Sequence, residues 1–258
     1  PFMKAKIQAS HKHDATVDHI GGAREEIIVF AREPEAGRVK TRLAGDSDAR
    51  FALSVYRRLL ARSLRLAHRV RRSRNVREAV CGLTVAADFS ASPATAGSSL
   101  ADTELGQFSA YAGATLWRQP SGDLGERMQA AFAASFARGA QRVILLGCDC
   151  PTLRHRDLHA ALTALDERPV VLAPTADGGY CLIGLRAPAP QLFNDMRWSQ
   201  PDVFATTVAR AGAAQVCELT MQRDVDHLAD WQHWCAAREA AGLPEARTWY
   251  PGQPCVDA

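Results

Sequence analysis

The stretch that decides the fold is Val143-Ile144-Leu145-Leu146-Gly147-Cys148-Asp149-Cys150-Pro151. Its first four residues are apolar and show neither the spacing of an amphipathic helix nor the alternation of a half-buried strand. They therefore predict a fully buried strand of a largely parallel sheet. Ligands of open α/β sheets bind beyond the carboxyl ends of the strands, so Asp149 is a candidate site residue. The alternative is an aspartate that caps a helix or closes a turn.

Length and composition set the class of protein. A chain of 258 residues suits one large α/β domain or two small ones, and 47% hydrophobic with 23% charged residues is ordinary globular composition. A net charge of +3 does not by itself indicate nucleic acid. Seven cysteines without a disulfide-like spacing favour a reducing cytosol. No apolar run approaches the roughly 20 residues that span a membrane. We expect a cytoplasmic protein without a membrane or nucleic-acid partner.

A cationic loop follows the first predicted strand, Glu26–Ala31. This loop carries Gly37, which permits close backbone approach, and the cations Arg32, Lys40 and Arg42. Such a loop at the end of a buried strand is typical of phosphate recognition. A P-loop is excluded, because no glycine directly precedes the lysine and the full spacing is absent. The alternative is a solvated basic loop.

The middle of the chain alternates helices and strands. Arginines recur along one face of the helix predicted over 48–74, and we interpret them as a solvated face rather than an RNA-binding surface. Residues 88–113 show no clear pattern of secondary structure. Gly122, Asp123 and Leu124 form a turn that feeds a helix, so either backbone amides there meet a ligand or Asp123 caps the helix. The predicted elements are a helix over 48–74, strands over 78–86 and 115–118, and a helix over 125–138.

The second half of the chain contains a turn after which the chain reverses its direction. The turn Asp177-Gly178-Gly179 leads into an apolar strand, Tyr180–Leu185, only about six residues after the strand 169–174 ends. A parallel crossover needs about a dozen residues or more, so the returning strand runs antiparallel or lies outside the preceding one, and the sheet is mixed. Asp177 should then share the sheet edge of Asp149. The alternative is an aspartate that only closes its turn. Helices over 155–166, 201–211 and 228–241 and a strand over 215–220 complete the prediction.

These elements predict one domain with two tails. Residues 1–24 are polar and without periodicity, and we interpret them as a flexible N-terminal tail. We expect residues 25–241 to form a single α/β domain and residues 242–258 to form a C-terminal tail.

The ordered motifs carry a resemblance to a known family. The chain resembles the DUF2064 family of GT-A-type transferases, often labelled glycosyltransferases and sometimes associated with arsenosugar biosynthesis. It is similar, more distantly, to the guanylyltransferases of molybdenum-cofactor and phospholactate metabolism. The resemblance implies a single-domain GT-A fold of the nucleotide-diphospho-sugar transferase type, a three-layer α/β/α sandwich with a mixed, mostly parallel sheet. The motifs are Phe30–Pro34, Gly37–Leu43, Gly122–Met128, Gly147–Pro151, Asp177–Tyr180, Trp198–Ser199 and Asp224–Asp226.

The resemblance also implies roles, residue by residue. Asp149 and Asp226 would bind a divalent metal, Mg²⁺ or Mn²⁺. Asp177 would face the acceptor and, with Lys40, take part in catalysis. Nucleotide phosphates would be held by Arg32, Gly37, Lys40 and Arg42, and the base or ribose would be approached by Gly122, Asp123 and Leu124. His227 and Ala229 depart from the family pattern, which tends to have Thr and Glu there, so the acceptor pocket is the less defined part of the site.

Three functions fit this pattern. The first is a metal-dependent glycosyltransferase that uses a nucleotide sugar. The second is a nucleotidyltransferase that releases pyrophosphate from a nucleoside triphosphate. The third is a non-catalytic nucleotide-binding module. The partners expected are a nucleotide or nucleotide-sugar donor and an unidentified small-molecule acceptor, and a homodimer is left open.

Overall fold

The structure is a computed structural model that describes residues 24–75, 80–89 and 99–243. The two tail predictions therefore lie largely outside the described residues. Arg24, which the N-terminal tail prediction included, is the first residue of a strand.

The described residues form a seven-stranded sheet in the order β3-β2-β1-β4-β6-β5-β7. Strand β6 runs antiparallel to both of its neighbours, and all other pairs are parallel. This confirms the mixed sheet that the short connection before Tyr180 predicted. The strands are β1 (Arg24–Arg32), β2 (Val80–Asp88), β3 (Thr115–Arg118), β4 (Arg142–Leu146), β5 (Val170–Pro174), β6 (Tyr180–Leu185) and β7 (Val216–Glu218).

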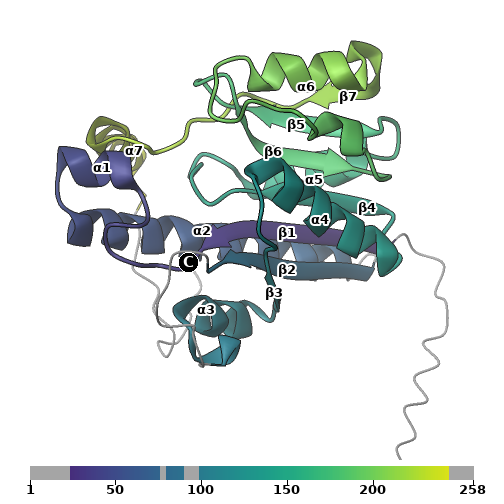
Figure 1. Cartoon of the computed structure of the whole chain (residues 1–258). Coiled ribbons are helices and arrows are strands. Elements are labelled where there is room, and N and C mark those ends of the chain that lie inside the picture. Colours follow the sequence, from purple (N-terminus) through teal and green to yellow (C-terminus); the bar gives the residue numbers. More distant parts are fainter. Residues whose placement is uncertain (1–23, 76–79, 90–98, 244–258) are drawn as a thin grey trace, which may run out of the picture.

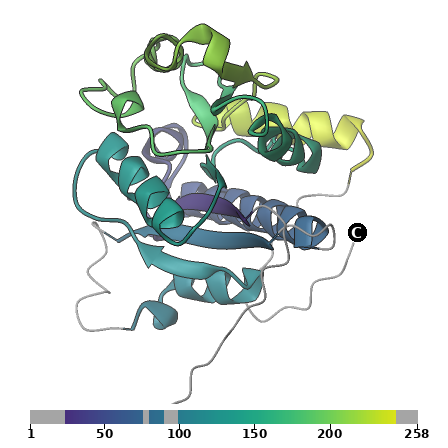
Figure 2. The ribbon, with the colours of Figure 1, turned by 90° about the vertical axis from the view of Figure 1, so that its right-hand side faces the viewer.

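Helices cover both faces of the sheet, which confirms the three-layer α/β/α architecture (Figure 1, Figure 2). On one face, apolar side chains of α2 (Ala49–Asn75), α3 (Glu104–Ala112) and α5 (His155–Ala164) pack against the strands. On the other face, α4 (Leu124–Ala137) and α6 (Val203–Ala211) bury a second apolar cluster. Strand β4 lies between these layers with four of its five residues buried, as its apolar run predicts. Short 3₁₀ helices occupy Leu100–Asp102, Pro190–Leu192 and Ala213–Gln215.

Two helices were not predicted. Helix α1 (Thr41–Asp46) begins inside the predicted cationic loop. Helix α3 lies in the segment without a clear signal, where its N-cap Thr103 accepts a hydrogen bond from the Gly106 amide. Neither helix is long enough to show a strong apolar period, which explains why the pattern missed them.

A third apolar cluster joins helices from the early and the late part of the described residues. Leu43 of α1 and Trp231 of α7 (Leu228–Ala240) are buried together against the first turns of α2. The carboxylate of Asp46 accepts a hydrogen bond of 3.1 Å from the Leu228 amide, and Figure 1 shows α1 beside α7. This packing brings the cationic loop and the Asp224–Asp226 segment to one place. None of the described helices combines the length and apolarity needed to cross a membrane.

Candidate active site

A cavity of about 710 Å³ opens at the carboxyl ends of β1, β4 and β5. Its volume lies in the range of small-molecule sites, roughly 300 to 1,000 Å³. Asp149 and Asp177 both line it, which confirms that they share one sheet edge. The strands that precede them point the same way, because β6 is antiparallel to both β4 and β5.

Lys40 is the centre of the charged part of this cavity. Its ammonium lies 2.7 Å from Asp149 Oδ1 and 3.2 Å from Asp226 Oδ1. The Lys40 side chain is 4% exposed, whereas those of the two aspartates are 49% and 28% exposed. Lys40 itself has a left-handed backbone, with φ of 49°, directly before the first turn of α1. The Lys40 ammonium therefore lies between the two carboxylates that the family resemblance assigns to a divalent metal.

The electrostatics keep that cation charged. Burial acts to lower the pKa of Lys40, but the negative charges of Asp149 and Asp226 outweigh it, so the Lys40 pKa lies above its usual 10.5. Arg42 Nη1 adds a second cation at 2.6 Å from Asp226 Oδ2. Both carboxylates thus have a cation as partner and line the cavity.

Two more acids stand beside this cluster. Asp177 Oδ1 accepts hydrogen bonds from the Thr175 hydroxyl (2.6 Å) and the Gly179 amide (3.0 Å), so it closes its own turn while it lines the cavity. Burial raises the pKa of Asp224 above its usual 3.8, and the charges of Asp177 and Asp226 raise it further. The structure therefore combines both interpretations of Asp177, and its part in the reaction stays a prediction.

The predicted turn at Gly122 is mainly a helix cap. Asp123 accepts a hydrogen bond of 2.9 Å from the Glu126 amide, and the Glu126 carboxylate accepts one of 2.8 Å from the Asp123 amide. Of the three residues predicted there, Leu124 lines the cavity, whereas Gly122 and Asp123 do not. Gly37 has φ of 77° and also lies outside the cavity wall. Nucleotide binding by Gly37, Gly122 and Asp123 stays a prediction.

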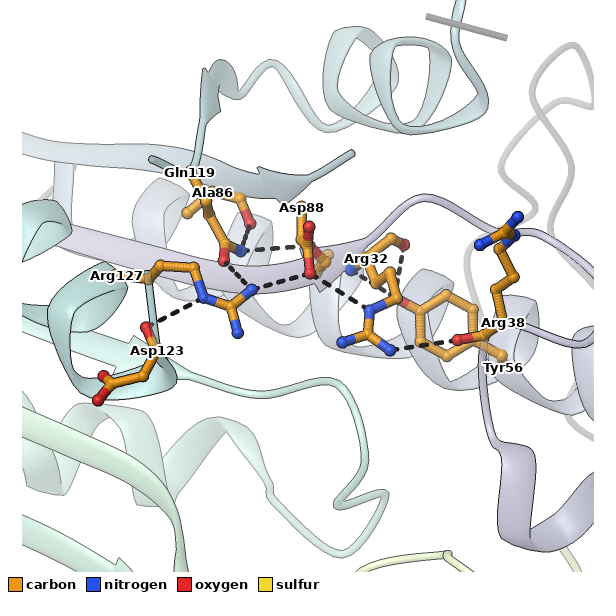
Figure 3. A network of polar contacts seen from close by, with 9 residues as sticks. Arg32, Arg38, Tyr56, Ala86, Asp88, Gln119, Asp123 and Arg127 are labelled. Atoms are coloured by element: carbon orange, nitrogen blue, oxygen red, sulfur yellow. Dashed lines mark hydrogen bonds and ion pairs between the residues drawn. The ribbon is translucent and has the colours of Figure 1, made fainter. Parts of the chain in front are cut away.

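Sequence reasoning missed a second polar network, which Figure 3 shows. The Asp88 carboxylate, 8% exposed, lies 3.3 Å from Arg32 Nε and 2.8 Å from Arg127 Nη1. Gln119 donates its amide hydrogens to the backbone oxygens of Ala31 (3.3 Å) and Ala86 (2.8 Å), while its oxygen accepts from Arg127 at 3.3 Å. Both arginines line the cavity, so the network fixes two cations in its wall.

The sequence contains a pattern that could have identified Asp88 as a site residue. Asp88 is the last residue of the largely apolar strand β2 and a single acid, a pattern like that of Asp149 shortly after β4. No comparable sequence pattern marks Gln119 or Arg127, because their roles depend on contacts with the ends of other strands.

No ready ligand set of three or more His, Cys, Asp or Glu side chains occurs within residues 24–75, 80–89 and 99–243. What the site offers a metal is the pair Asp149 and Asp226, whose oxygens meet at the Lys40 ammonium. Oxygen-only ligands of this kind suit Mg²⁺ and Mn²⁺, so the two residues fit such an ion with further ligands from a nucleotide or water.

The fold is an α/β fold of the nucleotide-diphospho-sugar transferase type. A family model described as "Uncharacterized protein conserved in bacteria (DUF2064)" matches residues 77–200. This confirms the resemblance to that family. No curated protein matches the chain in sequence.

Among solved structures, the chain is similar to a protein of Desulfovibrio desulfuricans G20 whose assignment as a nucleotide-diphospho-sugar transferase is provisional. The two chains are 28% identical with a TM-score of 0.72, over 87% of this chain and 91% of that one. This similarity confirms the fold.

More distant similarities are weak. A cytidylyltransferase of Leptospira borgpetersenii is 14% identical, with a TM-score of 0.49, over 84% of this chain and 87% of that one. Glucosyl-3-phosphoglycerate synthase of Mycobacterium tuberculosis is 11% identical, with a TM-score of 0.41, over 88% and 82%. Likeness this weak says nothing about the reaction of this chain.

Proposed function

We propose that the protein is a metal-dependent transferase that acts on a nucleotide-activated donor, and that it is a glycosyltransferase using a nucleotide sugar. The observation that carries the proposal is the Lys40 ammonium between Asp149 and Asp226, all three lining a cavity of about 710 Å³. Two partly exposed carboxylates are oxygen ligands that a divalent metal can use, and the cation beside them can bind the phosphates of a diphosphate.

The donor end of the cavity supports this function. Lys40, Arg42, Arg32 and Arg127 line it, and a nucleotide diphosphate is an anion that fixed cations bind strongly. The similar protein of Desulfovibrio desulfuricans G20 is provisionally assigned to nucleotide-diphospho-sugar transferases, which agrees with a nucleotide donor.

The metal proposal concerns Asp149 and Asp226 as ligands. A bound Mg²⁺ or Mn²⁺ would supply positive charge that stabilises the departing diphosphate. Lys40 and Arg42 would bind and orient the phosphates of the donor, and Asp177 would orient the attacking group or hold its proton.

Asp149→Asn tests the metal role, because it keeps the shape of the side chain and removes its charge. We expect nucleotide affinity in the presence of Mn²⁺ to fall at least about tenfold, the scale of a lost charge-assisted contact. Calorimetric titration of a nucleoside diphosphate with and without Mn²⁺ measures it. Equal affinity of variant and wild type under both conditions would contradict the proposal.

A nucleotidyltransferase is the second candidate, favoured by the density of cations around Lys40 and Arg42. The two reactions break different bonds: a glycosyltransferase releases a nucleoside diphosphate, whereas a nucleotidyltransferase releases pyrophosphate from a nucleoside triphosphate. Detecting the released product after incubation with nucleotide sugars and with nucleoside triphosphates separates them. Nucleotide binding without either product would indicate a non-catalytic module.

A further inference from the structure

The loop that carries Asp149 is tied directly to the segment that carries Asp226. The Thr152 hydroxyl donates a hydrogen bond of 2.8 Å to Oε1 of Gln222, which is 70 positions away in the sequence. The Arg223 backbone oxygen, at 3.4 Å, is the weaker of the two acceptors within its reach. The same hydroxyl oxygen accepts a hydrogen bond of 3.1 Å from the Arg223 amide. One side chain therefore joins the two segments both as a donor and as an acceptor.

A main-chain hydrogen bond also joins the two segments. The Val225 amide donates to the backbone oxygen of Asp149 at 2.9 Å. Val225 is 2% exposed and packs with Leu43 and Trp231 in the third apolar cluster. The backbone at Asp149 is thus held beside the residue that directly precedes Asp226.

Gln222, the partner of Thr152, is anchored to the sheet. It is buried, and its backbone amide donates a hydrogen bond of 2.8 Å to the oxygen of Pro174, the last residue of β5. Its side-chain nitrogen donates to the backbone oxygen of Thr220 at 2.9 Å, which fixes the orientation of the amide and leaves the side-chain oxygen for Thr152. Gln222 is therefore a fixed point against which Thr152 holds its loop.

Helix α2 holds the same loop independently. The Arg62 guanidinium donates hydrogen bonds to the backbone oxygens of Pro151 at 2.7 Å and Leu153 at 3.1 Å. Leu153 is also buried in the apolar cluster with α2 and α5. The loop therefore has anchors besides the Thr152 hydroxyl, and what this hydroxyl adds is the position of the loop relative to the segment of Asp226.

Thr152 lies outside the cavity that its loop helps to form. Asp149 and Asp226 line that cavity, whereas Thr152, Gln222 and Val225 do not. Thr152 instead lines a neighbouring cavity of about 460 Å³ beside α7. An effect of Thr152 on binding in the main cavity must therefore pass through residues that line it.

We propose that Thr152 is a positioning residue, which sets the placement of Asp149 relative to Asp226 for a divalent metal. The inference rests on the proposed function, in which these two carboxylates are the metal ligands. Their oxygens lie 2.7 Å and 3.2 Å from the Lys40 ammonium, so a small displacement of the loop separates them. Groups that orient metal ligands change metal affinity by about 10- to 100-fold when they are lost.

Thr152→Val tests the inference, because it keeps the shape of the side chain and removes the hydroxyl. Binding of UDP and of GDP to the full-length protein would be titrated calorimetrically with Mn²⁺ and without it. We expect the affinity with Mn²⁺ to fall at least about tenfold and the affinity without Mn²⁺ to stay within about twofold of wild type. Thr152→Ser keeps the hydroxyl and should retain the wild-type affinity with Mn²⁺.

Two further variants separate positioning from general stability. Thr152→Ala places no methyl group against the Gln222 oxygen and should show the same loss as Thr152→Val. Thr84→Val removes another buried threonine hydrogen bond, of 2.6 Å to Glu26, that lies outside the cavity. It should leave the affinity with Mn²⁺ unchanged. Circular dichroism establishes that each variant is folded.

A double-mutant cycle shows whether Thr152 acts through Asp149. In the Asp149→Asn background, Thr152→Val should change the affinity with Mn²⁺ by less than about twofold, because the ligand that it positions is absent. Losses that add, or a Thr152→Val variant with wild-type affinity, would overturn the inference while the proposed function stands. A wild type that binds these nucleotides equally with and without Mn²⁺ would refute the metal role in the proposed function, and the inference with it.

Discussion

The two ends of the sheet both bury charge, and they do so differently. At the amino end of β1, the Glu25 side chain is fully buried and accepts hydrogen bonds from Arg74 Nε at 2.7 Å, while Arg142 Nη2 lies 3.1 Å from it. Glu26 beside it accepts from the Thr84 hydroxyl and from Arg138, each at 2.6 Å. At the carboxyl end, Lys40 is buried, and its partners Asp149 and Asp226 are partly exposed and line a cavity.

This comparison shows that buried charge alone does not identify a functional site. The glutamates at the amino end are enclosed by arginines, and neither lines the cavity described above, so nothing remains for a ligand to bind. At the carboxyl end, Lys40 and Arg42 pair with the two oxygens of Asp226, whereas Asp149 pairs with Lys40 through Oδ1 and its side chain is 49% exposed beside the cavity. The first cluster stabilises the sheet, and the second is available for chemistry.

The largest effect should come from breaking the amino-end cluster. Glu25→Ala leaves two poorly exposed arginines without their shared anion, and we expect the free energy of unfolding to fall by about 3 to 5 kcal/mol. Denaturant unfolding measures it. Asp166→Ala is the matched control, because Asp166 also pairs with Arg142 but is 58% exposed, and its loss should cost less than about 1 kcal/mol. A small effect of Glu25→Ala would mean that the cluster does not stabilise the sheet.

The second largest effect is expected at the carboxyl-end cluster, Lys40 with Asp149 and Asp226. Lys40→Ala removes a charge-assisted phosphate contact worth about 1.5 to 3 kcal/mol, so nucleotide affinity should fall about tenfold to more than a hundredfold while the domain stays folded. Calorimetry and circular dichroism measure the two quantities. Arg38→Ala is the control in the same loop, because Arg38 pairs with Glu35 and lies outside the cavity wall. An unchanged nucleotide affinity in Lys40→Ala would contradict a phosphate-binding role for this loop.

Asp177 should affect turnover rather than nucleotide binding. Asp177→Asn keeps an oxygen for the Thr175 hydroxyl and the Gly179 amide but removes the charge. Turnover with an acceptor should fall at least about tenfold, the lower range for lost acid–base help, while the nucleotide dissociation constant stays near that of wild type. Asp202→Asn, nearby and outside the cavity wall, should leave both unchanged. Loss of nucleotide affinity in Asp177→Asn would instead place Asp177 with the donor.

The smallest effect depends on pH. Hydrogen bonds from the Leu228 amide and from His227 lower the pKa of Asp46 below its usual 3.8. Because the folded-state pKa is the lower one, the stabilisation is present above about pH 3.8 and is lost as the pH falls through the folded value. Asp46→Asn should therefore melt slightly below wild type near neutral pH, and the difference should shrink below pH 3.8. A difference that stays constant down to pH 2 would contradict this.

The sequence by itself determined the local elements and one part of the site. The apolar run before Gly147 required a buried strand, and the short connection before Tyr180 required an antiparallel return, because a strand crossover needs more chain than is present there. It also placed Asp149 and Asp177 at one sheet edge. These inferences depend on residues close together in the sequence, where period and turn chemistry act directly.

Only the tertiary structure decided which charges meet. Lys40 and Asp226 are 186 positions apart, and their contact depends on α1 packing beside α7. The Asp88 network requires the ends of β1, β2 and α4 to converge. Ion-pair geometry acts over a few ångströms of space, and strand order, which no local period encodes, sets those distances.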